Sequence, residues 1–151
     1  MKKAKSKAQQ LPLIGWRENL ILPDLGIKSI KAKIDTGART SALHAVDCHE
    51  FIHEGKTMIR FGIHPLQRNN KETVLAVAEL MEYRKITNSG GHAQTRPVIL
   101  TTVHLGEHQW QVELTLTNRD VMGFRMLLGR QAVKNRFAVD PGKSFLQSSR
   151  R

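Results

Sequence analysis

The chain has 151 residues, a hydrophobic content of 40% and a formal net charge of +11 at pH 7. This length suits one domain with a single core, and no run of about 18 apolar residues is present that could form a membrane-spanning helix. The one cysteine, Cys48, excludes an internal disulfide and favours a reducing, cytoplasmic compartment, and we interpret it as a small apolar strand residue rather than a nucleophile.

Basic residues are concentrated in part at the two ends of the chain. We expect a basic flexible tail over 1–12, a single domain over 13–146 and a second basic tail over 147–151. The overall charge favours an acidic partner, such as nucleic acid, a ribosomal surface or a polyglutamate-type chain.

Alternation of apolar and polar residues predicts strands along the first half of the domain. Ile30, Ala32 and Ile34 alternate with lysines, which indicates a half-buried strand that leads into Asp35. The preceding segment is typical of a hairpin turned at 23–26, and the segment 46–63 is typical of a hairpin turned at 53–56.

The second half continues the β pattern with one short helical segment. Residues 73–83 are apolar enough for a strand, with a helix as the alternative. Further along we expect a Gly-bearing polar segment over 84–97, a hairpin around Gly106, an apolar strand over 124–129, a short helix over 130–137 and a closing hairpin turned at 140–142. Many short strands and one short helix predict an all-β fold, a small closed or partly closed barrel.

Asp35, Thr36 and Gly37 stand where the alternating strand ends. The tripeptide alone is also common in turns, so its context carries the argument. About ninety residues later an apolar strand ends in Gly129 and Arg130, and a Gly-bearing polar segment lies between the two features. This ordered set of features indicates that the Asp35 carboxyl is held on a rigid loop, where it can serve a chemical reaction.

In that order, the Asp-Thr-Gly-Ala loop, the glycine-bearing segment and the Leu-Leu-Gly-Arg strand end resemble the retropepsin-like aspartic peptidases. The segments AKIDTGARTSALHA, RPVILTTVHLG, TLTNRDVMGFRMLLGR and FAVDPGKSFL are similar to a bacterial family linked by name to RimK. That family also carries the label of an ATP-dependent zinc protease. The resemblance covers about residues 13–146 and implies a retropepsin-like barrel.

The resemblance implies a hydrolase of peptide or amide bonds that activates water by acid–base catalysis, with Asp35 as the catalytic carboxyl. Two carboxyls about 3 Å apart share one proton, so one can accept a proton from water while the other polarises the substrate carbonyl. Since the chain has a single Asp-Thr-Gly, the second carboxyl must come from a symmetry mate. A homodimer with its site on the two-fold axis is therefore expected.

The resemblance also implies roles for the neighbouring residues. Thr36 would bond across the axis, and Gly37 would let the two backbones approach closely. The segment 84–97 would be a mobile flap that covers the substrate. Residues expected to support the site are Ala38, Leu127, Leu128, Gly129 and Arg130, and those expected to bind substrate are Arg39, Ser89, Gly90, Gly91 and Arg96.

The sequence departs from the viral members of the fold after Ala38. Arg39 and Thr40 stand where those enzymes usually carry acids that pair with the arginine matching Arg130, so the partner of Arg130 is left open. Arg39 is either a solvated loop residue or a contact for an acidic substrate. Together with Arg84 and Arg96 it would suit a glutamyl tail made by a RimK-type ligase. The interleaved terminal strands of the viral dimer have no evident match, so the dimer is inferred from chemistry alone.

The seven histidines do not form a helical His-Glu-x-x-His zinc motif. The pairs His49/His53 and His104/His108 fall in predicted strands and turns, where residues four apart lie about 13 Å from each other. No phosphate-binding glycine motif occurs either. We therefore predict no metal site and no cofactor, and zinc and ATP are implied only by the label of the family.

A second class of function is a non-catalytic basic β-barrel that binds RNA, a ribosomal surface or a polyglutamate-type partner. The aromatic content of 5% is low for base stacking, and no strand interleaves basic and aromatic residues. The enzyme hypothesis is therefore favoured. Its substrate would be a peptide or an acidic polypeptide, with a RimK-type ligase or the ribosome as candidate partners.

Overall fold

β-strands make up most of the chain, as the alternating pattern predicts. The structure is a computed structural model that describes residues 10–67, 69–88, 90–119 and 123–150. Two short helical segments are η1 (Pro23–Leu25) and α2 (Arg130–Val133). The strands are β1 (Leu13–Gly15), β2 (Arg17–Leu22), β3 (Ile27–Asp35), β4 (Ser41–His44), β5 (Val46–His53), β6 (Lys56–Ile63), β7 (Val74–Glu79), β8 (Glu82–Thr87), β9 (Ala93–Leu105), β10 (His108–Thr117), β11 (Met126–Gly129) and β12 (Ala138–Asp140).

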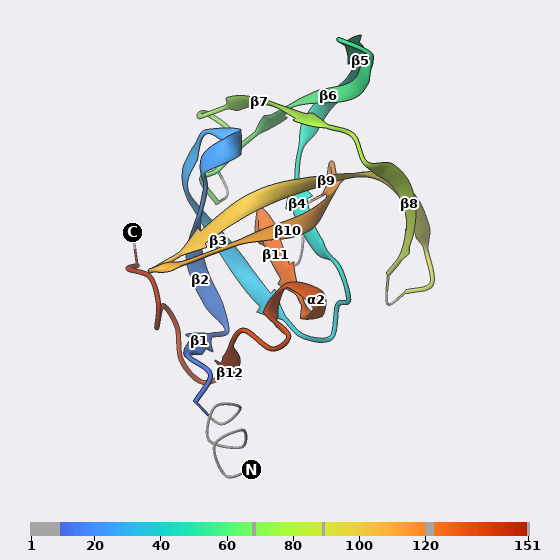
Figure 1. Cartoon of the computed structure of the whole chain (residues 1–151). Helices are drawn as coiled ribbons and strands as arrows, with labels where there is room; N and C mark the ends of the chain where they lie inside the picture. The colour runs from blue at the N-terminus through green and yellow to red at the C-terminus, as the bar shows by residue number, and fades with distance from the viewer. Residues whose placement is uncertain (1–9, 68, 89, 120–122, 151) are drawn as a thin grey trace.

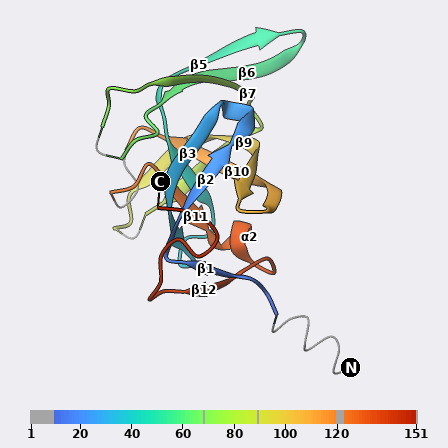
Figure 2. The ribbon, with the colours of Figure 1, turned by 90° about the vertical axis from the view of Figure 1, so that its left-hand side faces the viewer.

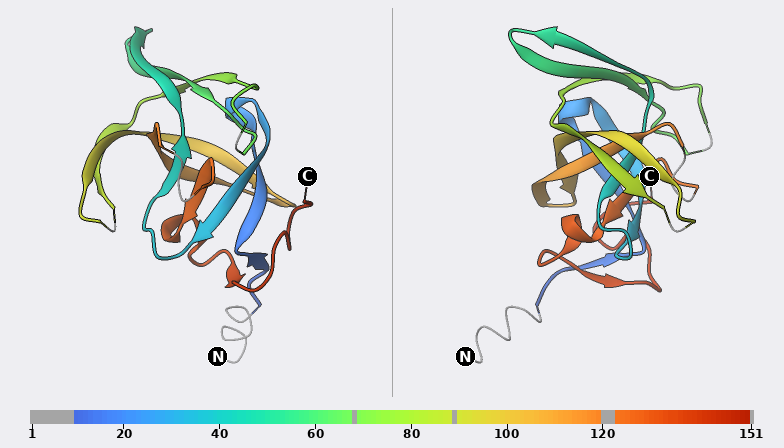
Figure 3. Two further views of the ribbon diagram at one scale, coloured as in Figure 1. Left: turned by 180° about the vertical axis from the view of Figure 1, so that it is seen from behind. Right: turned by 90° about the vertical axis from the view of Figure 1, so that its right-hand side faces the viewer.

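Six of these strands close into a barrel (Figure 1). Their order around the ring is β10, β4, β11, β3, β2 and β9, and the pairing of β9 with β10 closes it. β8 extends the same sheet beyond β9 as an edge strand, and the β8–β9 hairpin stands out from the ring when the molecule is seen from behind (Figure 3). This architecture confirms the predicted fold class.

The barrel interior contains the residues that the alternating pattern assigns to one face. On β3, Ile30, Ala32 and Ile34 are buried, whereas the lysines between them are partly exposed. Burial of each of the two isoleucine side chains contributes about 1.5–3 kcal/mol. The inward face of β3 therefore holds this strand, and with it the start of the Asp35 loop, firmly against the core.

The three predicted hairpins around residues 23–26, 53–56 and 106 all form. The second of them is β5–β6, which joins β7 in a separate three-stranded sheet. Figure 2 shows this hairpin projecting away from the barrel. The projecting sheet packs on the barrel through the buried face of β6, which carries Ile59, Phe61 and Ile63.

Residues 73–83 form strands and no helix, but the extended segment is broken after Glu79. Leu80 donates its backbone N–H to Thr57 in the projecting sheet, and Met81 donates to Val98 in the barrel sheet. The chain thus passes from one sheet to the other at this point. Long-range pairing sets the position of this break. The apolar pattern of residues 73–83 is uniform, so it does not predict the break.

The predicted closing hairpin at the C-terminal end is wrong. The turn at Asp140 forms, since its side chain accepts the N–H of Gly142 and its carbonyl accepts that of Lys143. The chain beyond it does not pair back, however, because β12 instead lies parallel to β1 in a two-stranded sheet. Residues 143–150 contain no strand.

The segment after the Asp140 turn is held by a buried carboxylate instead of a strand ladder. Glu18 is fully buried, and its oxygens accept hydrogen bonds from the backbone of Gly15, Leu146 and Gln147 and from the hydroxyl of Ser148. A buried charge is tolerated where hydrogen-bond donors surround it in this way. The predicted domain boundary at 146 stays a prediction, and most of the predicted tail 1–12 lies outside the described residues.

None of the helices within the described ranges is long and apolar enough to cross a membrane. Both helical segments, η1 and α2, span a single turn.

The Glu18 cluster generates a test of stability. Glu18→Gln should lower the free energy of unfolding by about 2 kcal/mol, because the amide nitrogen cannot accept the bonds that a carboxylate oxygen accepts. Chemical denaturation followed by tryptophan fluorescence measures this loss. Glu79→Gln on β7, where the side chain is exposed, is the matched control. Equal losses in the two variants would contradict the anchoring role.

Candidate functional site

The Asp35 loop begins where β3 ends. The half-buried Asp35 carboxyl accepts the backbone N–H of Gly37 through Oδ1 at 2.9 Å, and its carbonyl accepts the N–H of Ala38 at 3.2 Å. These two bonds make a tight turn that fixes the carboxyl relative to its own loop. Thr36 and Gly37 at the turn are exposed, so both are accessible for contact at the surface of the chain.

β11 lies directly beside this loop. It pairs in parallel with β3, where Leu128 lies opposite Ile34, and in antiparallel fashion with β4, where Leu127 lies opposite Ala42. The strand is thus inserted between the strands that enter and leave the loop. Leu127 and Leu128 are buried. Both leucines thus pack beside the loop, and their role in supporting a catalytic site stays a prediction.

Gly129 at the end of β11 makes the closest contact with the loop. Its N–H donates to the buried Ser41 hydroxyl at 3.0 Å, and the next N–H, of Arg130, donates to the Ala38 carbonyl at 2.7 Å. A Cβ at this position would lie 2.7 Å from the Thr40 carbonyl carbon and 2.9 Å from the Ala38 oxygen. Only glycine fits, because any side chain would push the loop away from β11.

Arg130 finds a partner that the sequence left open. Its Nη1 donates to the backbone carbonyl of Thr36 at 3.0 Å. The guanidinium therefore binds the loop backbone where an acidic side chain would have served in the viral pattern. The Arg130 side chain thus binds the loop at Thr36, and Gly129 packs against the loop backbone at Ala38 and Thr40.

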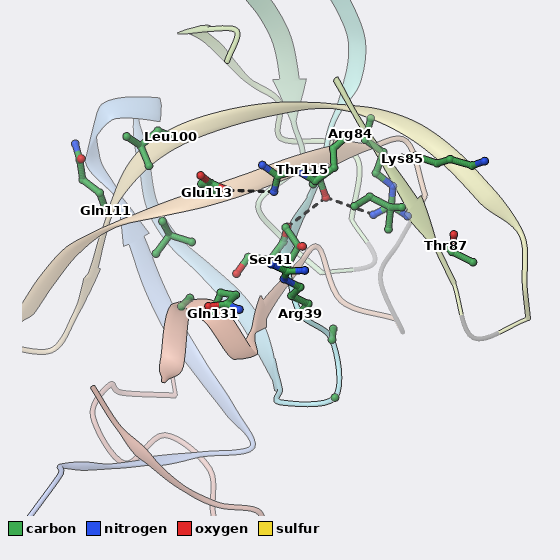
Figure 4. Close-up of a pocket in the computed structure, with 17 residues that line it drawn as sticks. Arg39, Ser41, Arg84, Lys85, Thr87, Leu100, Gln111, Glu113, Thr115 and Gln131 are labelled. Carbon is green, nitrogen blue, oxygen red and sulfur yellow. Dashed lines mark hydrogen bonds and ion pairs between the residues drawn. The ribbon is translucent and has the colours of Figure 1, made fainter. Parts of the chain in front are cut away.

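A groove of about 1000 Å³ opens beside the loop (Figure 4). In that view Ser41, Arg39 and Gln131 lie on one side, and Thr115, Glu113 and Arg84 lie on the other. Gly37 and Ala38 of the loop line the groove, whereas Asp35 and Thr36 are not among the lining residues. Within one chain, Asp35 therefore lies next to the groove, and its loop forms part of the wall.

The β8–β9 hairpin forms the other wall and corresponds to the expected flap. Its tip is a loop in which the Asn88 side chain accepts the N–H groups of Gly90 and His92. Gly91 has a φ of 83°, a conformation that favours glycine. Ser89 lies outside the described residues. The hairpin exists as expected, and its motion as a flap stays a proposal.

Positive charge predominates along the groove. Arg39, Lys85 and Arg96 line it without an acidic partner in ion-pair contact among the described residues. Arg84 differs, because it donates to Glu82 at 2.9 Å and to Glu113 at 3.0 Å. The bond to Glu82 is the main cause that raises the pKa of the Arg84 guanidinium, and Glu113 adds to it. Arg84 is therefore less available to an acidic ligand than the sequence alone suggested.

The residues present do not fit a zinc site. Within the described ranges, no three side chains of histidine, cysteine, aspartate or glutamate lie close enough together to hold a metal ion. The His53 ring lies 3.8 Å from the neighbouring Glu54 carboxylate, and the His108 ring packs edge-on against Phe137. Cys48 lies on β5, and partial burial together with the charge of Asp47 raises the pKa of its thiol, which disfavours the nucleophilic thiolate.

Two residues of this region escaped the sequence analysis. Ser41 joins the start of β4 to β11 and β10, since its hydroxyl accepts from Gly129 and its carbonyl accepts from the Thr115 hydroxyl at 3.2 Å. The sequence feature that could have identified Ser41 is a polar residue at the start of an apolar strand. Arg119 lies beside Arg96 and lines a second cavity. The sequence feature that could have identified Arg119 is a basic residue shortly after the end of a long strand.

Comparison with known proteins agrees with this geometry. A family model described as RimB-like, "Retropepsin-like aspartic endopeptidase RimB", matches residues 13–150. A probable alpha-L-glutamate ligase of Shewanella halifaxensis is 46% identical over 133 residues, which are 88% of this chain and 29% of that protein. A protein of the same description from Desulfotalea psychrophila is 44% identical over 129 residues, 85% of this chain and 28% of that protein. The chain thus spans less than a third of the length of these curated relatives.

A solved structure has the same fold. It is a Legionella pneumophila protein of unknown function with 29% sequence identity and a TM-score of 0.75. The match covers 90% of this chain and 98% of that chain. The similarity therefore extends over most of this chain.

The contact beneath the loop can be tested by adding one methyl group. Gly129→Ala should lower the free energy of unfolding by about 2–3 kcal/mol, since the Cβ would overlap backbone atoms that cannot rotate away. Gly142→Ala is the control, because its Cβ would meet only the Asp140 side chain at 3.5 Å. Thermal unfolding of both variants measures the difference. A Gly129→Ala protein as stable as the control would show that the loop does not depend on this approach.

Proposed function

The chain belongs to the RimB-like family of retropepsin-like aspartic endopeptidases, and on this basis we propose that it hydrolyses peptide or amide bonds. The active form would be a homodimer in which each chain contributes one Asp35. The observation that carries the proposal is the position of this carboxyl. It stands on a turn that β11 and Arg130 hold rigidly, beside a groove large enough for an extended polypeptide.

The chemistry requires two carboxyls that share a proton. The ionised Asp35 would accept a proton from water as the water attacks, and the protonated Asp35 of the mate would polarise the carbonyl of the scissile bond. The Gly37 N–H donates a hydrogen bond to the Asp35 carboxyl of the same chain and so fixes its orientation. A rigid loop matters here, because an error of about 1 Å in the position of a catalytic group can cost a hundredfold in rate.

The charges along the groove favour an acidic substrate. Arg39, Lys85 and Arg96 outnumber the single acid Glu113 among the lining residues, and Glu113 is already bonded to Arg84. The name of the similar proteins, probable alpha-L-glutamate ligase, refers to the ligation of glutamate. We therefore propose a glutamate-rich polypeptide as the substrate class and a RimK-type ligase or its ribosomal target as the partner. The single cysteine supports a cytoplasmic setting.

A non-catalytic basic module is the second candidate. The net charge of +11 favours it, because such a charge attracts acidic partners without any chemistry. In that case the groove would bind an acidic chain and release it intact. The two candidates differ in whether a covalent bond of the bound chain is cleaved.

Replacement of the carboxyl tests the enzyme hypothesis. Asp35→Asn should reduce hydrolysis roughly 10²–10⁴-fold or abolish it, because the amide cannot accept the proton from water. Cleavage of a peptide library that includes glutamate-rich members, followed by mass spectrometry, measures the effect. Asp47→Asn is the control, since this residue is exposed on β5 and its φ of 54° suits asparagine. Equal activity of the Asp35→Asn protein and the parent would refute the assignment.

The dimer hypothesis predicts a dependence on protein concentration. Since one chain supplies a single Asp35, the activity per chain should fall on dilution as dimers dissociate. Sedimentation velocity over the same concentration range would show the loss of the dimer in parallel. A protein that stays monomeric throughout and still hydrolyses peptides would exclude the shared site.

A further inference from the structure

A second cavity of about 400 Å³ adjoins the groove beneath the β8–β9 hairpin. Ile86 and Arg96 line both spaces, so the two are neighbours along the hairpin. The cavity also contains Arg119, which follows the end of β10. We call the part of this cavity formed by Arg96 and Arg119 the arginine pocket.

Neutral side chains hold Arg96 in place. Its Nε donates to the Gln94 side chain at 2.9 Å, and its Nη1 reaches the Thr115 hydroxyl at 3.4 Å. Gln94 is itself fixed by the Thr117 hydroxyl at 3.2 Å. Among the bonds between described residues none uses Nη2, and no described carboxylate lies within ion-pair distance of this guanidinium.

The exposed Arg119 brings a second positive charge close to the half-buried Arg96. Burial lowers the pKa of Arg96, and the charge of Arg119 lowers it further. Two guanidinium groups without a counter-charge repel each other, and the repulsion is stronger where water is partly excluded. A bound anion would remove this cost and would gain charge-assisted hydrogen bonds from the planar donors.

We propose that the arginine pocket binds a carboxylate group of the substrate and so forms a specificity subsite beside the groove. The inference rests on the proposed function, because it assigns the pocket to the same polypeptide that the groove would hold. The carboxylate has two sources in a polypeptide, a glutamate or aspartate side chain and the C-terminal α-carboxylate. Both present the same pair of oxygens to the two arginines.

A neighbouring position in the groove is a poorer place for such a group. Arg84 lies opposite Arg96 in the pairing of β8 with β9, but it is already bonded to Glu82 and Glu113, so its charge is compensated. Glu113 would in addition repel an incoming carboxylate. The acidic group of the substrate is thus directed toward Arg96 and Arg119, at the side of the groove where the hairpin tip lies.

Peptide binding tests the pocket without the need for turnover. The Asp35→Asn protein is titrated into amino-terminally labelled hexaglutamate, and fluorescence anisotropy gives the Kd. Arg96→Gln and Arg119→Gln, each added to this background, should weaken binding about tenfold, which corresponds to about 1.4 kcal/mol. Arg96→Lys should give an intermediate Kd, because lysine keeps the charge but loses the planar fork.

Arg60→Gln is the matched control, since it removes the same charge from an exposed position on β6 in the projecting sheet. Its Kd for hexaglutamate should stay within about twofold of the parent value if the effect is local. Equal weakening by Arg60→Gln and the pocket variants, or unchanged binding in both pocket variants, would overturn the proposal. Arg119 is exposed, so its variant remains informative even if Arg96→Gln impairs folding.

Two modified peptides distinguish the sources of the carboxylate. If a side chain enters the pocket, hexaglutamate amidated at its C-terminus keeps its dependence on Arg96 and Arg119. If the α-carboxylate enters, hexaglutamine with a free C-terminus shows that dependence and amidation removes it. A neutral, amidated hexaglutamine that loses affinity in the same variants by the same factor would count against the pocket.

Hydrolysis by the parent protein is measured separately on the same peptides. Binding that depends on the two arginines without any cleavage would refute the proposed hydrolase and leave the subsite intact. Cleavage that requires Asp35 but is indifferent to both arginines would refute the subsite and leave the hydrolase intact. The two failures are therefore distinguishable.

Discussion

The position of the Asp35 loop depends on the close approach of one glycine to its backbone. Gly129 lies against the carbonyls of Ala38 and Thr40, and the hydrogen bonds from its own N–H and from the following N–H close that contact. The same strand completes the ring between β3 and β4. The contacts that hold β11 in the barrel are thus also the contacts that position the Asp35 loop, so the proposed chemistry would depend on the same few atoms as the stability of the barrel.

Much of the architecture could be predicted because it is recorded locally in the sequence. Period-two alternation through Ile30, Ala32 and Ile34 marks a strand with one buried face, and glycine or proline between two such strands marks a hairpin. The match to the retropepsin-like motifs extended these local signals to a whole barrel. The order of Asp35, the glycine-bearing hairpin and Gly129 carried that match and placed β11 correctly beside the loop.

The remaining features depend on contacts that no local pattern records. The parallel pairing of β12 with β1 replaced the expected hairpin because Glu18, about 130 residues away in sequence, takes up the N–H groups of Leu146 and Gln147. The engagement of Arg84 by Glu113 and the approach of Arg119 to Arg96 are likewise set by the pairing of strands. The charge of a residue can be read from the sequence, but whether that charge is compensated cannot.

The anchoring of residues 146–149 has a consequence for protein engineering. Asn19 on β2 holds Ser148 and Ser149, and Figure 1 shows the C-terminal end of the chain on the opposite side of the molecule from the tip of the β8–β9 hairpin. Any polypeptide fused after this segment therefore leaves the domain on the side remote from the groove. An affinity tag, a fluorescent reporter or a surface-immobilisation handle attached there would leave the entrance of the groove unobstructed.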